Sequence, residues 1–286
     1  MTELVTGETL PNVVVTGIAM TTALATDAET TWKLLLDSQS GIRKLEDSFV
    51  EEFDLPVRIG GHLLEEFDSQ LTRVELRRTG YLQRMSTILG RRVWENAGSP
   101  EVDSNRLMVS IGTGLGSSEE MVFSYDDMRA RGMKAVSPLA VSKYMPDGAA
   151  VAVGLERHAK RAVFPSPRCR RAAVRLRGIA QAWRNIVFGE APTSRSAAGV
   201  ETKIEGGGRS RVRPDAIVMF DQERPTLSRP VRPRLSTGSA GKTGFVVSGE
   251  AGALMVDANR ENTPKARGAN ILARIMGVRA SYPPTA

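Results

Sequence analysis

Short β-branched runs alternate with helical stretches along the first 160 residues, and this alternation constrains the fold most strongly. Val13–Gly17 and Arg106–Ile111 are the two clearest runs, and each is the kind of short apolar segment that is typical of a buried strand. Cap signals and apolar periodicity predict helices that follow Asp27 and that cover Leu71–Asn96, Glu119–Gly132 and Gly148–His158. Strands that alternate with helices predict an α/β fold in which helices cover both faces of a sheet.

The predicted helix ends have recognisable signals. Asp27 is a good N-cap for the first helix, which Ser40 and Gly41 end. The helix over 71–96 has an apolar stripe, made of Leu76, Leu82, Met85, Leu89 and Val93. Its predicted solvent side carries four arginines, Arg77, Arg78, Arg91 and Arg92, and it stops at Gly98, Ser99 and Pro100.

The character of the chain changes at Arg161. Residues 1–160 hold 17 Lys and Arg against 23 Asp and Glu, a net charge of −6, whereas residues 161–240 hold 16 against 6, a net charge of +10. Prolines and glycines interrupt this second region, so we expect it to be poorly ordered except for a helix over 179–190 and a strand end over 199–204. Apolar patterns return from Gly244 onward, notably in Ala253–Val256 and Ala269–Met276.

Composition excludes several classes of protein. Cys169 is the single cysteine, which rules out an internal disulfide and a multi-cysteine metal site, and His62 and His158 lie far apart with no acidic or thiol ligand at metal spacing. We therefore expect no metal and no cofactor. No stretch approaches the roughly 20 apolar residues of a membrane span, and the N-terminus lacks a signal pattern, which predicts a cytoplasmic protein.

Three further motifs have two interpretations each. The glycines of residues 112–116 follow a strand, so a phosphate loop is possible, but their spacing is wrong for a dinucleotide fingerprint and a tight turn is the better interpretation. Gly241–Thr243 resembles the end of a P-loop, but Ser236 stands where the required glycine should be. Cys169 lies among arginines, which would favour a reactive thiolate.

Several long segments resemble the β-ketoacyl–acyl-carrier-protein synthases, and most closely the branch that extends meromycolate chains in mycolic-acid synthesis. The resemblance runs without gaps from about Val13 to Lys160 and resumes in shorter pieces downstream. It is carried by Val13–Leu24, Gln39–Ile42, Val109–Ser117, Met145–Ala150, Ile179–Trp183, Gly199–Thr202 and Lys265–Gly277.

The resemblance implies the first half of a thiolase-like fold, a layered α/β structure. It implies an acyltransferase in which a cysteine at a helix N-terminus takes an acyl chain from acyl carrier protein. Two histidines then assist a decarboxylative condensation with malonyl–acyl carrier protein. Acyl carrier protein is the implied partner, and the resemblance also implies a homodimer that forms through strands beside the nucleophile.

The catalytic cysteine is not where the resemblance requires it. The family has a segment of the Val-Ser-Ala-Cys-Ala type, and this chain has Pro167–Ala173 there. Counting forward from Lys160 places the family cysteine at Arg170, and counting back from Trp183 places it at Ala172, so neither count reaches Cys169. A one-base frame slip in GC-rich DNA converts Pro-Val-Ser-Ala-Cys-Ala into Arg-Cys-Arg-Arg-Ala, which is the sequence of residues 168–172.

These observations predict four regions: a well-matched ketosynthase region at 1–160, a degraded one at 161–243, a recovered segment at 244–277 and an aberrant tail at 278–286. We interpret Cys169 as a decoy and expect a frame-shifted, truncated synthase with no catalytic residue, because the second half with both family histidines is missing. The alternative is a non-catalytic remnant that binds acyl carrier protein or a partner enzyme and uses the +10 region at 161–240 to hold an acidic partner. Homodimerisation is doubtful, and no nucleic-acid module is present.

Overall fold

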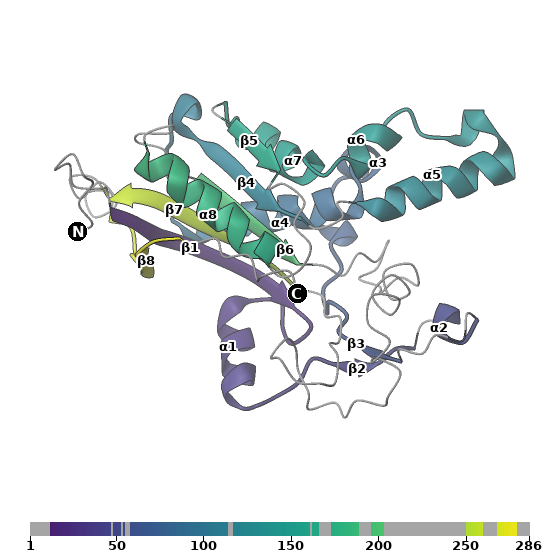
Figure 1. Ribbon diagram of the computed structural model, residues 1–286, viewed down its shortest axis with the longest axis horizontal. Coiled ribbons are helices and arrows are strands. Elements are labelled where there is room, and N and C mark those ends of the chain that lie inside the picture. The colour runs from purple at the N-terminus through teal and green to yellow at the C-terminus, as the bar shows by residue number, and fades with distance from the viewer. Residues whose placement is uncertain are drawn as a thin grey trace, which may run out of the picture.

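The computed structural model describes residues 12–46, 48–52, 54, 58–113, 117–160, 162–165, 173–188, 196–202, 250–259 and 268–278. Figure 1 shows the arrangement of these segments. The strands are β1 (Asn12–Thr22), β2 (Arg43–Lys44), β3 (Ile59–Gly60), β4 (Met108–Gly112), β5 (Ala162–Pro165), β6 (Ser196–Thr202), β7 (Glu250–Asn259) and β8 (Ala273–Ile275). The helices are α1 (Ala28–Leu36), α2 (Ser48–Glu52), α3 (Arg73–Arg78), α4 (Tyr81–Asn96), α5 (Ser118–Arg131), α6 (Ala140–Tyr144), α7 (Gly148–Glu156) and α8 (Ala173–Val187).

The described strands form a mixed sheet in the order β5-β4-β6-β7-β1-β8, beside a small β2-β3 pair. β4 pairs in parallel with both β5 and β6. β7 lies antiparallel between β6 and β1, so β1 runs in the same direction as β4, β5 and β6. The carboxyl ends of these four strands therefore meet at one edge of the sheet.

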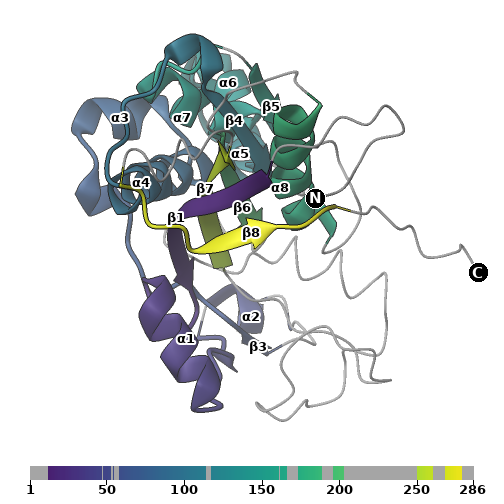
Figure 2. The ribbon, with the colours of Figure 1, turned by 90° about the vertical axis from the view of Figure 1, so that its left-hand side faces the viewer.

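Helices cover both faces of this sheet, as the alternation of strands and helices predicted (Figure 2). Side chains alternate between the faces along each strand. Val109 of β4 and Met255 of β7 pack in one apolar core with α4 and α7. Their neighbours Met108 and Val256 point to the opposite face, where they pack against α8. Both faces are thus buried, as in the layered α/β class.

β1 and β7, which are far apart in the sequence, pair with each other within the sheet. Their pairing runs from Asn12 opposite Asn259 to Thr22 opposite Glu250, with a bulge between Val15 and Gly17. At the bulge, the Thr16 hydroxyl donates to a buried carboxylate oxygen of Asp257 at 2.7 Å. β7 lies within the predicted recovered segment of 244–277, so residues 250–259 of that segment are an integral part of the sheet.

Most of the predicted elements are confirmed. The Asp27 carboxylate caps α1 by accepting from the Thr30 N–H at 2.8 Å, and Gly98, at φ 81°, follows the end of α4. The predicted helix that starts at Gly148 is also confirmed, and its Ala149 and Ala150 are buried in the core with α4.

The prediction of one helix over 71–96 is wrong. The chain forms α3 and α4, which are separated by Thr79 and Gly80 in extended conformations. A Cβ at Gly80 would lie 3.0 Å from the Glu120 carboxylate of α5, and Gln83 accepts from the Gly80 N–H at 2.8 Å. Tertiary contacts and side-chain caps therefore stabilise the break, although the apolar period continues through it.

The predicted basic region at about 161–240 contains more regular structure than expected. Its described residues form β5, α8 and β6, and α8 begins at Ala173, which is earlier than the predicted start at Ile179. The other residues of this region, together with the predicted apolar run Gly244–Val247 and the tail at 279–286, lie outside the described residues. In the part of the chain that the structure describes, no helix has the length and apolar character needed to cross a membrane.

Candidate functional site

The position that the resemblance assigns to the nucleophile lies between β5 and α8. β5 is the described edge strand next to β4, and it ends at Pro165. α8 begins at Ala173 and is anchored on the sheet by the buried residues Ala182 and Ile186. The connecting residues 166–172, which include Cys169, Arg170 and Ala172, lie outside the described residues. The edge where the parallel strands end is therefore the candidate active-site edge of the fold.

Buried polar side chains follow the end of β4 at the same edge. Thr113, Ser117 and Glu119 are each at most 2% exposed, and Ser110 within β4 is fully buried. Ser117 is the N-cap residue of α5. The middle of the glycine loop, residues 114–116, lies outside the described residues, so the choice between a tight turn and a phosphate loop stays a prediction.

The two histidines are held by different elements. His62 follows β3, whereas His158 ends α7 with a left-handed φ of 54° and donates its backbone N–H to the Leu155 carbonyl. Among the described residues, no group of three His, Cys, Asp or Glu side chains could hold a metal ion. His158 has a structural position at a helix end.

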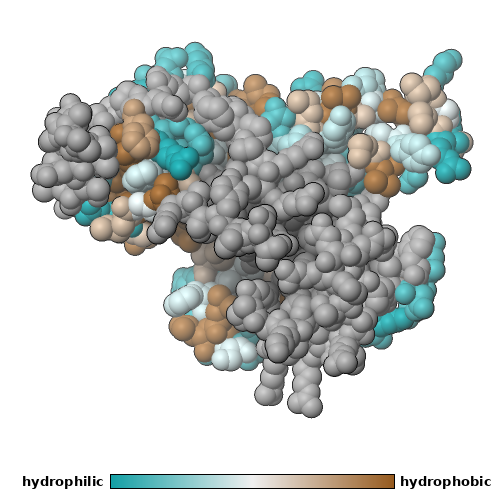
Figure 3. Space-filling model, viewed as in Figure 1, coloured by the Kyte–Doolittle hydropathy of each residue, from teal (hydrophilic) through white to brown (hydrophobic). Residues whose placement is uncertain are grey.

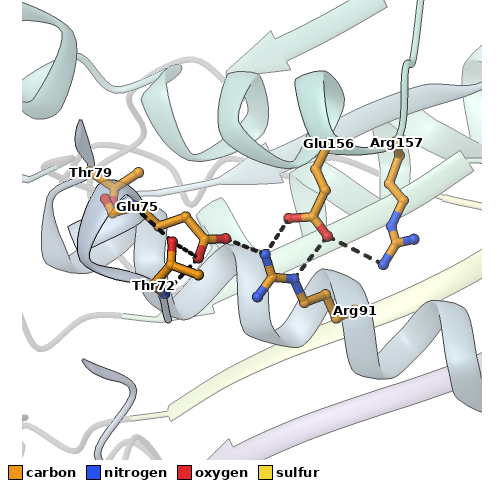
Figure 4. Close-up of polar contacts among 6 residues, drawn as sticks. All are labelled: Thr72, Glu75, Thr79, Arg91, Glu156 and Arg157. Atoms are coloured by element: carbon orange, nitrogen blue, oxygen red, sulfur yellow. Dashed lines mark hydrogen bonds and ion pairs between the residues drawn. The ribbon is translucent and has the colours of Figure 1, made fainter. Parts of the chain in front are cut away.

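An ion-pair network that the sequence did not predict connects α3, α4 and α7 (Figure 4). Arg91 of α4 donates to both carboxylate oxygens of Glu156 on α7, at 2.9 and 3.0 Å. It also pairs with Glu75 of α3 at 2.5 Å. Arg157 lies 3.5 Å from Glu156 and stacks over the Trp94 ring at 5.1 Å. The apolar stripe of the helix predicted that Arg91 and Arg92 lie on its solvent side. The prediction is partly correct: the two side chains remain 30% and 32% exposed, but both are held in ion pairs, Arg92 with Glu65.

Glu75 has two roles in this network. It completes a capping box with Thr72, whose backbone N–H and hydroxyl both donate to one Glu75 carboxylate oxygen, at 2.7 and 2.6 Å. These bonds from Thr72, together with the bond from Arg91, lower the pKa of Glu75 to about 2. The Glu156 and Glu75 carboxylates in turn raise the pKa of Arg91 above its ordinary value. Glu75 and Arg91 are therefore both charged at neutral pH.

A second arginine of α4 holds the other end of α3. Arg84 donates to the backbone carbonyls of Leu76 and Thr79, at 2.8 and 3.1 Å. It also pairs with Asp68 at 3.0 Å. Side-chain donors at the last carbonyls of a helix satisfy groups that the helix itself leaves unbonded.

The outer surface of α3 carries three exposed arginines, Arg73, Arg77 and Arg78, which we call the arginine face. Arg77 donates from Nε to the Arg73 carbonyl at 3.3 Å. In the described part of the chain, none of the three forms an ion pair. Their charges are therefore available to an acidic partner.

Apolar side chains also lie exposed on two parts of the surface (Figure 3). One part is α1, where Trp32 and Leu36 are more than 60% exposed. The other follows α5 and α6 and includes Met121, Tyr125, Met133, Leu139 and Val141. Exposed apolar groups of this kind often mark surfaces that another protein segment covers.

The two-sided mixed sheet and the strand-to-helix junction at its edge define a thiolase-like, layered α/β protein. The chain belongs to the β-ketoacyl synthase family: the family model described as "Beta-ketoacyl synthase, N-terminal domain" matches residues 11–262. The family resemblance drawn from the sequence is therefore confirmed.

Individual relatives agree with this assignment. The chain is 66% identical over 279 residues to 3-oxoacyl-[acyl-carrier-protein] synthase 2 of Mycobacterium leprae, covering 96% of this chain and 63% of that protein. The crystal structure of a β-ketoacyl synthase from Burkholderia phymatum matches with a TM-score of 0.76 and 25% identity, over 94% of this chain and 64% of that chain. A type II polyketide ketosynthase structure, in complex with its acyl carrier protein, matches with a TM-score of 0.73 and 18% identity, over 93% of this chain and 62% of that chain. The chain thus spans less than two thirds of the length of these relatives.

Proposed function

We propose that this chain is a β-ketoacyl–acyl-carrier-protein synthase scaffold that does not catalyse the condensation by itself. The observation that carries the proposal is the sequence between β5 and α8. The family reaction needs a cysteine there, in a segment of small residues, and both counts from flanking matches place arginine or alanine at that position. The regions proposed above, with a degraded segment at 161–243, follow from the same observation.

The chemistry of the junction supports the proposal. Acyl transfer requires a thiolate at a helix N-terminus, which attacks the acyl carbonyl and releases the thiol of the carrier. Arg168, Arg170 and Arg171 bring three charges into a segment that the family fills with small residues. Burying such charges without partners is costly. A cysteine between these arginines would therefore lack the family's surroundings.

The test is acyl transfer to Cys169. The purified chain is incubated with acyl–acyl carrier protein, and intact mass and peptide mapping report any thioester, with Cys169→Ala as the matched control and a mycobacterial relative as the positive control. We expect no adduct on Cys169. An adduct that Cys169→Ala removes would overturn the proposal and make Cys169 the nucleophile.

Binding of acyl carrier protein without catalysis is the second candidate function. The arginine face of α3 favours it, because the implied carrier is acidic and these exposed arginines have no ion-pair partner among the described residues. Electrostatic complementarity of this kind steers association and weakens with salt. The homodimer and the cytoplasmic location stay predictions.

Titration of a fluorescent acyl carrier protein with this chain tests the second candidate. We expect binding that weakens as the salt concentration rises, and weaker binding when Arg73, Arg77 and Arg78 are all replaced by alanine. Affinity that neither salt nor this triple substitution changes would rule out the arginine face as the binding surface.

A further inference from the structure

We propose that Arg84 and Arg91 of α4 are positioning residues that hold the arginine face of α3 in its binding orientation. This inference rests on the carrier-protein binding proposed above. Neither arginine belongs to the face itself. Both contact α3 from α4: Arg84 binds backbone carbonyls at the end of α3, and Arg91 binds the Glu75 side chain.

α3 cannot be placed by apolar burial. It contains six residues, none of them buried, and its apolar Val74 is 49% exposed. A helix of this length is unstable by itself in water, since the cost of starting it exceeds the gain from its few hydrogen bonds. Its like charges oppose it further, because Arg73 and Arg77 are one turn apart.

Polar contacts from α4 supply the stabilisation of α3 that apolar burial does not provide. Arg84 binds the carboxyl end of α3 through the Leu76 and Thr79 carbonyls. Arg91 binds the amino end through Glu75. Each end of α3 is therefore attached to α4 by a different guanidinium.

α4 is a suitable base for this attachment. Its Met85, Ile88 and Leu89 are at most 4% exposed in the main apolar core. Arg91 is held in turn by Glu156 of α7 through two hydrogen bonds. The orientation of α3 is thus set by rigid elements of the fold.

When the arginine face is already held in one orientation, binding of a partner loses no further conformational entropy from ordering it. Immobilising side chains and a backbone segment on binding lowers affinity, and we expect roughly tenfold weaker carrier binding when the attachment is lost. Loss of the attachment should act through the arginine face alone. Replacing the face and an attachment residue together should therefore weaken binding no more than replacing the face.

A double-mutant cycle on the full chain tests this inference. Carrier affinity is measured at 25 °C for Arg91→Gln, for the triple alanine variant of the face and for their combination. Arg131→Gln is the matched control, since it removes an arginine from an exposed ion pair with Asp127 on α5. Glu75→Gln is the second variant, because it leaves the Arg91–Glu156 pair in place if Arg91→Gln does not fold. Near-UV circular dichroism confirms that each variant is folded.

Hydrogen exchange of residues 73–79 is the second measurement. We expect faster exchange of this segment in Arg91→Gln and in Glu75→Gln, unchanged exchange of β4, wild-type affinity for Arg131→Gln, and non-additive losses in the cycle. Additive losses, or unchanged exchange in α3, would overturn the positioning role. If the triple variant binds like wild type, carrier binding at α3 fails, while exchange in α3 still reports whether the Arg91–Glu75 contact holds the helix.

Discussion

Met255→Ala tests whether β7 completes the sheet. Met255 is fully buried and packs between β7 and α4 in the main core. The substitution removes the Cγ, Sδ and Cε groups, and full burial of a methionine side chain is worth roughly 1.5–3 kcal/mol of transfer free energy. Incomplete collapse of the cavity adds to this, so we expect the free energy of unfolding to fall by about 3 kcal/mol.

Urea unfolding followed by tryptophan fluorescence measures the effect. Trp183 of α8 is a suitable probe, because it packs beside Val256 of β7. We expect the midpoint to fall by about 1 M at an unchanged slope. Met276→Ala is the matched control, since Met276 is 73% exposed, and it should change stability by less than about 0.5 kcal/mol. Equal, small effects of both substitutions would refute the placement of residues 250–259 between β1 and β6.

Glu75→Gln should lower the free energy of unfolding at pH 7 by roughly 1 kcal/mol. This value follows from the lowering of the Glu75 pKa to about 2, and it is reduced because the side chain is partly exposed to solvent. Because the pKa of Glu75 is lower in the folded state, its contribution to stability is present above the unfolded pKa and is lost as the pH falls through the folded pKa. Chemical unfolding should therefore show the stabilities of wild type and Glu75→Gln converging from about pH 4.5 to pH 2. Asp27→Ala should cost about 1 kcal/mol by removing the α1 cap, with a thermal melt as the measurement. Gly17→Ala should cost about 1–3 kcal/mol, because its Cβ would lie 2.8 Å from the Ala97 Cβ. Gly252→Ala, with its nearest contact at 3.6 Å, is the control, and equal losses would contradict the close packing at Gly17.

The sequence by itself was sufficient for the family, for the α/β class and for most helix and strand positions. Short stretches of sequence specify these features: a β-branched run predicts a buried strand, Asp27 predicts a helix start, and Gly98 predicts a helix end. The proposal that the small-residue segment around the expected nucleophile is lost also comes from the sequence, because it rests on a comparison of residues along the chain.

Tertiary structure decided what depends on residues far apart in the chain. The break between α3 and α4 is invisible in the apolar periodicity, which continues through the extended residues Thr79 and Gly80. The sequence pattern predicts only that Arg91 faces solvent, because its partners Glu75 and Glu156 are close to it in the fold and not in the sequence. In the same way, only the pairing of β1 with β7 places Asp257 beside Thr16. Local patterns report burial and caps, whereas the partner of a charged or strand-edge group is set by three-dimensional proximity.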